Sequence, residues 1–230
     1  MDVSLRGRRA LVCGASAGIG RAVALCLAEQ GAEICALARR ADRLEALLPE
    51  LLSAGAPAAH AIVADLDDRP ALASAVQAHL DAHGPVHILV NNTGGPPGGP
   101  LLEAGEEAFL QGFGRHVLAS HRLVLLVLPG MREAGYGRIV NVISTSVREP
   151  IPNLGVSNTI RGAMASWAKT LSRELPPGLT INNVLPGFTD TERLALLDQA
   201  MELAPGLAPA MAAHAIATIT AWFITENDDD

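Results

Sequence analysis

The run CGASAGIG at residues 13–20 decides how this chain of 230 residues folds. It follows an apolar segment of strand length, residues 10–13, and precedes an amphipathic segment with helical period, residues 21–30. Glycine permits backbone conformations that other residues avoid, so a strand can turn tightly through these glycines into a helix. We therefore predict a strand, a glycine turn and a helix at the start of the fold.

The same alternation of short apolar runs and longer amphipathic stretches continues along the chain. It predicts βαβ units, so we expect an α/β fold of the Rossmann type, a doubly wound parallel sheet in a three-layer α/β/α arrangement. We find no internal repeat and no linker, which favours a single domain over residues 1–230. The expected strands are 10–13, 33–38, 59–64, 87–91, 138–143 and 179–185, and the expected helices are 21–30, 42–54, 71–83, 106–128 and 159–175.

The last part of the chain departs from this alternation. Pro205, Gly206 and Pro209 interrupt it, residues 210–224 have a helical pattern, and no further run of strand type follows. We expect the parallel sheet to lack its last edge strand, which leaves an edge that needs cover.

Composition limits the classes of function. Hydrophobic residues make up 49% of the chain and charged residues 18%, which is typical of a packed domain rather than a disordered chain. A formal net charge of −7 with no long Lys/Arg run offers no basic surface to nucleic acid or an anionic membrane. No apolar run has the length of a membrane span, and the early glycines interrupt any export signal. We expect a cytoplasmic protein with Cys13, Cys26 and Cys35 reduced in its core.

The glycine turn has the composition of a phosphate-binding loop. Gly14, Gly18 and Gly20 allow close backbone approach to a ligand, and the start of the following helix attracts an anion. The turn therefore favours a dinucleotide, and a plain strand-to-helix connection is the alternative. Asp65 follows the third expected strand and Asn92 the fourth, at the sheet edge where open α/β folds bind ligands.

These motifs resemble those of the short-chain dehydrogenase/reductase family over about residues 5–194. The likeness lies in the glycine loop, the Asp65-Leu66 pair, the Asn-Asn-Thr-Gly turn at residues 91–94, where the family has Ala in place of Thr93, and Pro186-Gly187. The resemblance implies a relative of the 3-oxoacyl-carrier-protein reductases, which would transfer a hydride between a nicotinamide cofactor and a small carbonyl or alcohol.

The end of the second expected strand bears on the choice of nicotinamide cofactor. In the family an acidic residue there takes the ribose hydroxyls of NAD, whereas a nearby arginine suits NADP. Here Ala38 is followed by Arg39 and Arg40, so we expect NADP(H), and two arginines that only solvate a strand end are the alternative. The residues expected at the cofactor are Gly14, Ser16, Gly18, Ile19, Gly20, Arg39, Arg40, Asp65, Leu66, Asn92, Gly94, Arg161, Pro186, Gly187, Thr189 and Thr191.

The resemblance also implies four catalytic positions, of which only one keeps the family's residue. Ser144 stands at the serine position after the fifth expected strand. The tyrosine position, thirteen residues on, holds Ser157, and the lysine position four residues further holds Arg161. The position of the helix asparagine holds His116.

The family's tyrosine and lysine have no substitute elsewhere in the chain. The one tyrosine, Tyr136, is followed four residues on by Val140, and the one lysine, Lys169, follows Ala165 by four. A serine hydroxyl is a much weaker acid than a phenol, and arginine keeps its proton at ordinary pH. We expect slow hydride transfer unless another donor acts. His116 is the candidate donor, and a histidine packed in the core is the alternative.

Two classes of function remain open at this point. The first is an NADP(H)-dependent reductase with a changed catalytic site, and the second is a cofactor-binding protein without turnover. We expect a homodimer or homotetramer that pairs through residues 106–128 and 159–175, and a short substrate lid at residues 189–209.

Three histidines, His79, His83 and His87, are spaced by four residues. Gly84-Pro85 ends the expected helix between the last two, and no glutamate completes a zinc-protease pattern. We interpret them as solvated residues at a helix end and expect no metal.

Overall fold

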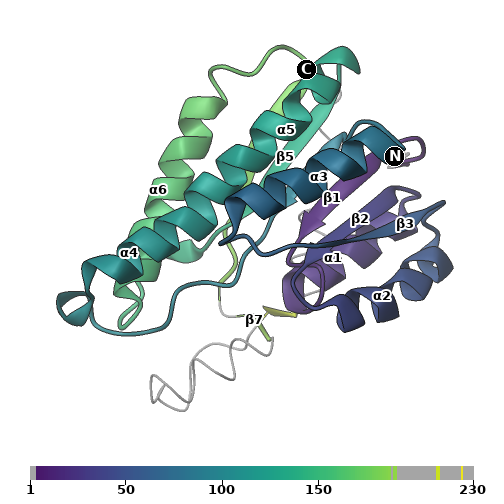
Figure 1. The fold of residues 1–230 in the computed structure, drawn as a ribbon. Coiled ribbons are helices and arrows are strands. Elements are labelled where there is room, and N and C mark those ends of the chain that lie inside the picture. Colours follow the sequence, from purple (N-terminus) through teal and green to yellow (C-terminus); the bar gives the residue numbers. More distant parts are fainter. Residues whose placement is uncertain (1–3, 188, 191–210, 213–223, 225–230) are drawn as a thin grey trace.

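Six parallel strands form the centre of the molecule (Figure 1). The computed structural model describes residues 4–187, 189–190, 211–212 and 224. The order of the strands in the sheet is β3-β2-β1-β4-β5-β6, and every neighbouring pair is parallel. The strands are β1 (Arg9–Cys13), β2 (Glu33–Ala38), β3 (Ala59–Val63), β4 (Ile88–Asn91), β5 (Gly137–Val142) and β6 (Leu179–Val184).

Helices cover both faces of this sheet. α1 (Gly18–Glu29) and α2 (Ala41–Ala54) pack on one face, and α3 (Arg69–His83), α5 (Ala119–Glu133) and α6 (Gly155–Leu171) pack on the other (Figure 1). The doubly wound α/β/α fold predicted from the sequence is confirmed. None of the helices that the structure describes is long and apolar enough to cross a membrane.

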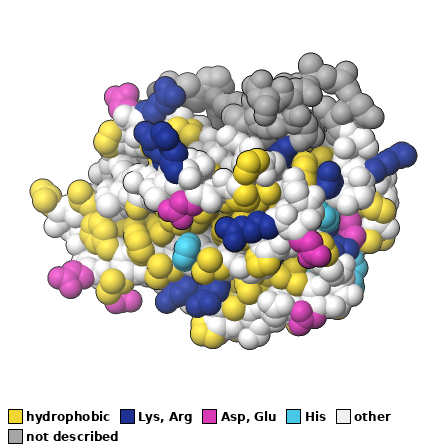
Figure 2. Space-filling view, turned by 90° about the horizontal axis from the view of Figure 1, so that it is seen from above, with side chains coloured by type: hydrophobic (Ala, Val, Ile, Leu, Met, Phe, Trp, Pro, Cys, Tyr) yellow, Lys and Arg dark blue, Asp and Glu magenta, His cyan; other side chains and the backbone are white. Residues whose placement is uncertain are grey.

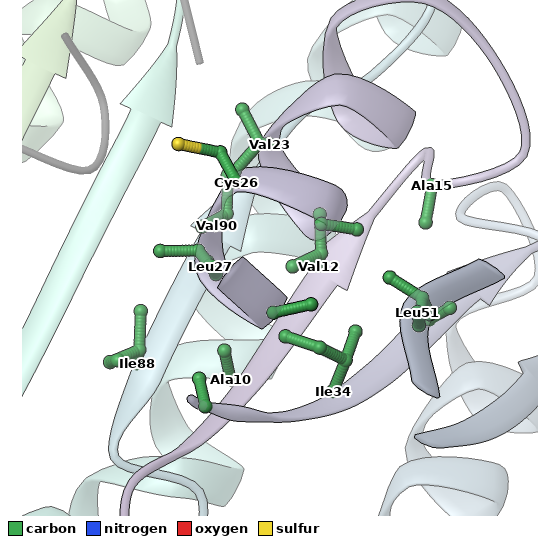
Figure 3. Packing of buried hydrophobic residues seen from close by; sticks show 14 of the residues in the cluster. Ala10, Val12, Ala15, Val23, Cys26, Leu27, Ile34, Leu51, Ile88 and Val90 are labelled. Carbon is green, nitrogen blue, oxygen red and sulfur yellow. The ribbon is translucent and has the colours of Figure 1, made fainter. Parts of the chain in front are cut away.

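Alternate residues of each central strand serve the two opposite cores. Ala10 and Val12 of β1 point to the core under α1, whereas Leu11 and Cys13 belong to the core under α3 and α5. Figure 3 shows Val12 beside Val23 and Leu27 of α1, with Ile34 of β2 on its other side. Strands buried on both faces read as continuous apolar runs, which is why the sequence located them closely. The three cysteines are buried and free, as predicted.

The long helix predicted over residues 106–128 is interrupted in the structure. α4 (Glu106–Phe113) passes into a π-helical turn, η2 (Gly114–Leu118), before α5 begins. A single π turn shifts the helical face by one residue without breaking the apolar pattern, so periodicity cannot detect it. α6 also begins and ends four residues before the predicted range 159–175.

The end of the chain is described only in short segments. β7 (Thr189–Asp190) pairs in parallel with β8 (Met211–Ala212), apart from the main sheet. The predicted helix over residues 210–224 was therefore wrong at its start, because residues 211–212 pair with a distant segment instead of forming local helical bonds. In the part of the chain that is described, β6 is an edge of the six-stranded sheet. Most of the predicted lid, residues 189–209, lies outside the described residues.

The prediction that His79 is a solvated helix-end residue was wrong. His79 is only 8% exposed, and its Nε2 lies 2.8 Å from the Cys35 Sγ of β2. The His60 and His83 rings lie 5.4 and 4.6 Å from the His79 ring, centroid to centroid. The helical face of α3 turns toward β2 and β3 here, so a polar residue at a core position is buried. Within the described ranges, no group of three or more His, Cys, Asp or Glu side chains could hold a metal ion.

The buried histidine makes the stability of the fold depend on pH. Burial, followed by the nearby His83 and His60, lowers the pKa of His79 to about 4 from its ordinary value. The unfolded chain takes up this proton near pH 6.5 and the folded chain does not, so acid favours unfolding. Between pH 7 and pH 5 we expect this site to cost about 2 kcal/mol of unfolding free energy. Urea denaturation across this pH range measures it.

His79→Leu should flatten the pH dependence, because the variant no longer has this site. The matched control is His121→Leu, which removes an exposed histidine of α5 and should leave the slope unchanged. Equal slopes for His79→Leu and the original chain would contradict the assignment.

Candidate functional site

A cavity of about 460 Å³ lies at the carboxyl ends of the central strands. β1 stands between β2 and β4 in the sheet, so the loops after β1 and β4 run to opposite faces of the sheet. Open α/β sheets form a crevice for ligands at such a point. Most of the predicted site residues line it: Gly14, Ser16, Gly18, Ile19, Arg39, Arg40, Asp65, Leu66, Asn92, Gly94, Ser144, Ser157, Arg161, Pro186 and Gly187.

Two predicted site residues, Gly20 and His116, are not among the residues that line the cavity, and two others are described only in part or not at all. Gly20 lies beneath the glycine turn and His116 is buried behind the wall. Thr189 belongs to β7, of which the structure describes the backbone, and Thr191 lies outside the described residues.

The structure also brings residues to the wall that sequence reasoning missed. Ile151 and Leu154 contribute apolar surface beside the two serines, and Arg115 comes from the π-helical turn η2. Ile151 and Leu154 lie in the segment between Ser144 and Ser157, which could have drawn attention to them. The sequence gives no comparable indication for Arg115, because the π-helical turn determines the direction in which its side chain points.

The glycine turn packs closely against the loop after β4. A Cβ atom on Gly14 would lie 2.6 Å from Asn92 Nδ2, and one on Gly20 would lie 2.3 Å from the Gly14 carbonyl oxygen. Gly14 also has a φ of +64°, which favours glycine. The Asn92 side-chain amide donates to the Cys13 carbonyl at 3.2 Å and so joins the ends of β1 and β4.

The start of α1 opens onto the cavity. No side chain caps this end of the helix, and Ala17, Gly18 and Ile19 line the wall. The first backbone N–H groups of a helix have no partner within it, and they carry the positive end of the helix dipole. This end of the cavity therefore favours an anionic group such as a phosphate.

Two arginines after β2 border the same end of the cavity. Arg40 Nη2 donates to Ser16 Oγ at 3.2 Å, across the glycine turn. Arg39 Nη1 lies 3.7 Å from Asp65 Oδ2, and both of these side chains are well exposed. The charges at this end of the cavity are thus mainly positive and accessible.

Three asparagines form a ladder across the far strands. Asn91 Nδ2 donates to Asn141 Oδ1 at 2.8 Å, and Asn141 Nδ2 donates to Asn183 Oδ1 at 2.9 Å. They are aligned in register on β4, β5 and β6, and Asn141 is fully buried. Because buried amides need partners, the ladder holds the three strand ends together beneath the cavity.

Ser144, Ser157 and Arg161 all line the cavity, on the side of β5 and α6. Ser144 Oγ accepts a hydrogen bond from the Ser146 amide at 3.1 Å and begins the short 3-10 turn η3 (Thr145–Val147). Ser157 and Arg161 lie one turn apart on α6, and both are buried. The Arg161 guanidinium donates through Nη1 to the Val142 carbonyl at 3.0 Å, which fixes it near the end of β5.

His116 reaches the cavity only through another side chain. It is 1% exposed, and its Nδ1 is in hydrogen-bond contact with Thr93 Oγ1. Thr93 lines the cavity. Thr93 and His116, which are 23 residues apart in the sequence, are therefore in contact with each other.

The chain is similar to known proteins over most of its length. The family model for short chain dehydrogenase matches residues 8–202. The L-xylulose reductase of Mesocricetus auratus is 36% identical over 188 residues, covering 81% of this chain and 73% of the relative. The 3-oxoacyl-acyl-carrier-protein reductase of Pseudomonas aeruginosa is 32% identical over 202 residues, covering 86% and 80%.

A solved structure shares the whole fold. The L-sorbose reductase of Gluconobacter frateurii, complexed with NADPH and L-sorbose, is 26% identical and superposes with a TM-score of 0.90. The match covers 98% of this chain and 92% of the sorbose reductase. The chain thus belongs to the short chain dehydrogenase family, a family of oxidoreductases.

Close packing at Gly20 predicts a sharp effect of one methyl group. We expect Gly20→Ala to lower the unfolding free energy by about 2–3 kcal/mol, because its Cβ would overlap the rigid Gly14 backbone. The matched control is Gly162→Ala in α6, where nothing lies within 4 Å of the added Cβ. That change should stabilise by about 0.5–1 kcal/mol, since alanine is the better helix former. Urea denaturation measures both, and equal effects would contradict this packing.

Proposed function

We propose that this protein is an NADP(H)-dependent oxidoreductase that reduces a small carbonyl compound, or oxidises the corresponding alcohol. The observation that carries the proposal is the cavity itself, with an uncapped helix start and a glycine turn at one end and a group of hydroxyls at the other. The sorbose reductase of the same fold was solved with NADPH and a sugar, which supports this choice.

The residues present fit a nicotinamide dinucleotide. Gly14 and Gly20 pack the turn tightly against Asn92, which fixes the turn at the uncapped start of α1, where the first backbone amides could receive a pyrophosphate. We propose that Asp65, Leu66 and Gly94 hold the adenosine half, and that Pro186, Gly187 and Thr189 hold the nicotinamide half. Thr191 would cap its loop near the pyrophosphate.

The two arginines favour the phosphorylated form of the cofactor. A 2′-phosphate would gain charge-assisted hydrogen bonds from Arg39 and Arg40, which NAD cannot make. The end of β2 carries Ala38 in place of a carboxylate, so β2 itself brings no negative charge toward the phosphate, and the Asp65 carboxylate is paired with Arg39. NADP(H) is the form we propose.

When bound, the cofactor supplies or accepts the hydride. Ser144 and Ser157 are placed to hydrogen-bond a substrate oxygen, because both hydroxyls lie at the same end of the cavity. Arg161 is held by the Val142 carbonyl and can donate to ribose hydroxyls, but it cannot pass on a proton. Ser157 is also a poor acid, so we propose that this catalytic site is atypical and slow unless a proton comes from elsewhere.

We propose that His116 supports this proton supply from behind the wall. Its contact with the Thr93 hydroxyl links a buried imidazole, which can carry a proton on either ring nitrogen, to the cavity. His116 would thus act as a positioning residue for Thr93, which itself faces the cavity.

A second function is supported by the same residues. The cofactor-binding motifs are all present, whereas the acid at the tyrosine position is replaced, so a protein that binds NADP(H) without turnover is the alternative. The burial of two polar residues, Ser157 and Arg161, on the cavity wall favours a rebuilt active site over a disused one, because burying polar groups without a use is costly.

A binding experiment tests the cofactor assignment. We expect the protein to bind NADPH more tightly than NADH, and the double variant Arg39→Leu with Arg40→Leu to lose at least about tenfold in NADPH affinity while NADH affinity stays constant. Fluorescence titration of the reduced nucleotides measures this. Arg122→Leu, an exposed arginine of α5, is the control. No binding of either nucleotide by the original chain would overturn the proposed function.

A turnover experiment separates the reductase from the silent protein. With a panel of small ketoses and β-keto esters, we expect slow NADPH oxidation that Ser157→Tyr with Arg161→Lys raises at least about tenfold, because a phenol donor returns to the site. In the original background His116→Ala should lower turnover and change its pH profile. Binding of NADPH with no oxidation by the original chain would favour the silent protein, and unchanged turnover in His116→Ala would remove the histidine from the mechanism.

We also propose that the protein pairs with a second copy through the helices of residues 106–128 and 159–175, which are α4, η2, α5 and α6 in the structure. Figure 2 shows hydrophobic side chains gathered on the side of the molecule where α4 and α6 lie in Figure 1. Four large apolar side chains are exposed along α4, η2 and α5: Leu110, Phe113, Leu118 and Leu125. A single exposed apolar residue needs no explanation, but several on neighbouring elements indicate a contact surface. A solution mass of one chain by light scattering would contradict a homodimer or homotetramer.

A further inference from the structure

Arg115 is held in one orientation on the cavity wall. Its Nε lies 2.9 Å from Asp67 Oδ1 and 3.0 Å from Asp67 Oδ2, and its Nη2 also contacts Oδ2. Arg115 belongs to η2 and Asp67 to the loop after β3, so the pair joins two elements that meet at the cavity rim. A guanidinium bound by a carboxylate along one edge loses most of its rotational freedom.

The carboxylate partner is itself well ordered and charged. The hydrogen bonds from Arg115 hold the pKa of Asp67 below its ordinary value, with smaller contributions from Arg39 and Arg69. The Asp67 amide donates to Asp65 Oδ1 at 3.0 Å, so the loop that carries Asp65 and Leu66 is tied to the same pair. Arg115, Asp65 and Leu66 all line the cavity.

We propose that the adenine ring of the bound dinucleotide stacks on the flat face of the Arg115 guanidinium. This inference rests on the proposed function and deepens it by assigning one residue to the base. Guanidinium planes stack on aromatic rings and bases, and the interaction is strongest when the plane is held in place.

The geometry favours a base over a phosphate as the partner of Arg115. A phosphate binds the edge N–H groups of an arginine, and here Nε and Nη2 are directed to Asp67. The carboxylate also offsets the charge that would attract a phosphate. Arg40 reaches the glycine turn through Ser16 Oγ, and Arg39 lies 3.7 Å from one oxygen of Asp65, so these two arginines are the ones placed for a phosphate. Leu66 adds apolar surface at the same end of the cavity, as a base requires.

A set of partial ligands tests this assignment. Three ligands are compared. NADPH is the whole dinucleotide, 5′-AMP keeps only the adenosine half, and reduced nicotinamide mononucleotide keeps the nicotinamide half and lacks the adenine. We expect Arg115→Met to weaken NADPH and 5′-AMP by the same factor, about fivefold or more, and to leave the mononucleotide unchanged. Isothermal titration calorimetry gives all three affinities, and Arg122→Met on α5 is the control, expected to bind like the original chain.

Arg115→Lys separates the flat face from the charge. Lysine keeps the positive charge but has no plane, so it should bind 5′-AMP as weakly as the methionine variant does. Original affinity in Arg115→Lys would overturn the inference, as would unchanged 5′-AMP binding in Arg115→Met or an equal loss for the mononucleotide.

Folding of these variants can be checked independently. Asp67 keeps Arg39 and Arg69 as nearby positive charges, so the loss of Arg115 does not leave its carboxylate without a counter-charge. Thermal unfolding of each variant measures this directly. If the original chain binds NADPH and 5′-AMP while the Arg115 variants bind them equally well, only this inference fails. If the original chain binds none of the ligands, the proposed function fails with it.

Discussion

The close approach of the glycine turn to the loop after β4 is the constraint on which the site depends. Gly14, Gly20 and Asn92 occupy space in which no additional carbon fits, and the Asn92 amide bonds the carbonyl at the end of β1. This contact joins the segments that follow the paired strands β1 and β4, which run to opposite sides at the switch point. The helix start, the two arginines after β2 and the serines beyond β5 all border the same cavity.

The fold could be predicted from the sequence because strands covered on both faces must be apolar throughout. Strands such as β2 therefore begin and end where the apolar runs do. The π-helical turn and the burial of His79 could not be predicted in this way. The turn adds one residue without interrupting the apolar pattern, so periodicity does not reveal it. His79 occupies a core position, although histidine is not a residue type that predicts burial. Arg115 was missed for the first of these reasons, since the turn sets where its side chain points.

Within the candidate site, motif spacing located the cavity-facing residues better than it located the buried ones. Ser144, Ser157 and Arg161 follow the spacing of a strand end and one helical face, and all three line the cavity. The motif spacing places His116 in the long helical segment after β4, but its contact with Thr93 depends on how closely η2 approaches the loop after β4. A motif comparison treats these two positions separately, whereas the structure makes them neighbours.

The asparagine ladder has a consequence for how the protein can move. Asn91 donates to Asn141 in the interior, and Asn141 donates to the half-buried Asn183, so sliding one strand past its neighbour would break these side-chain bonds in addition to the main-chain ladder. The row therefore stiffens β4, β5 and β6 as a unit. We expect movement at the cavity to involve the segments that project beyond these strand ends and not the strands themselves.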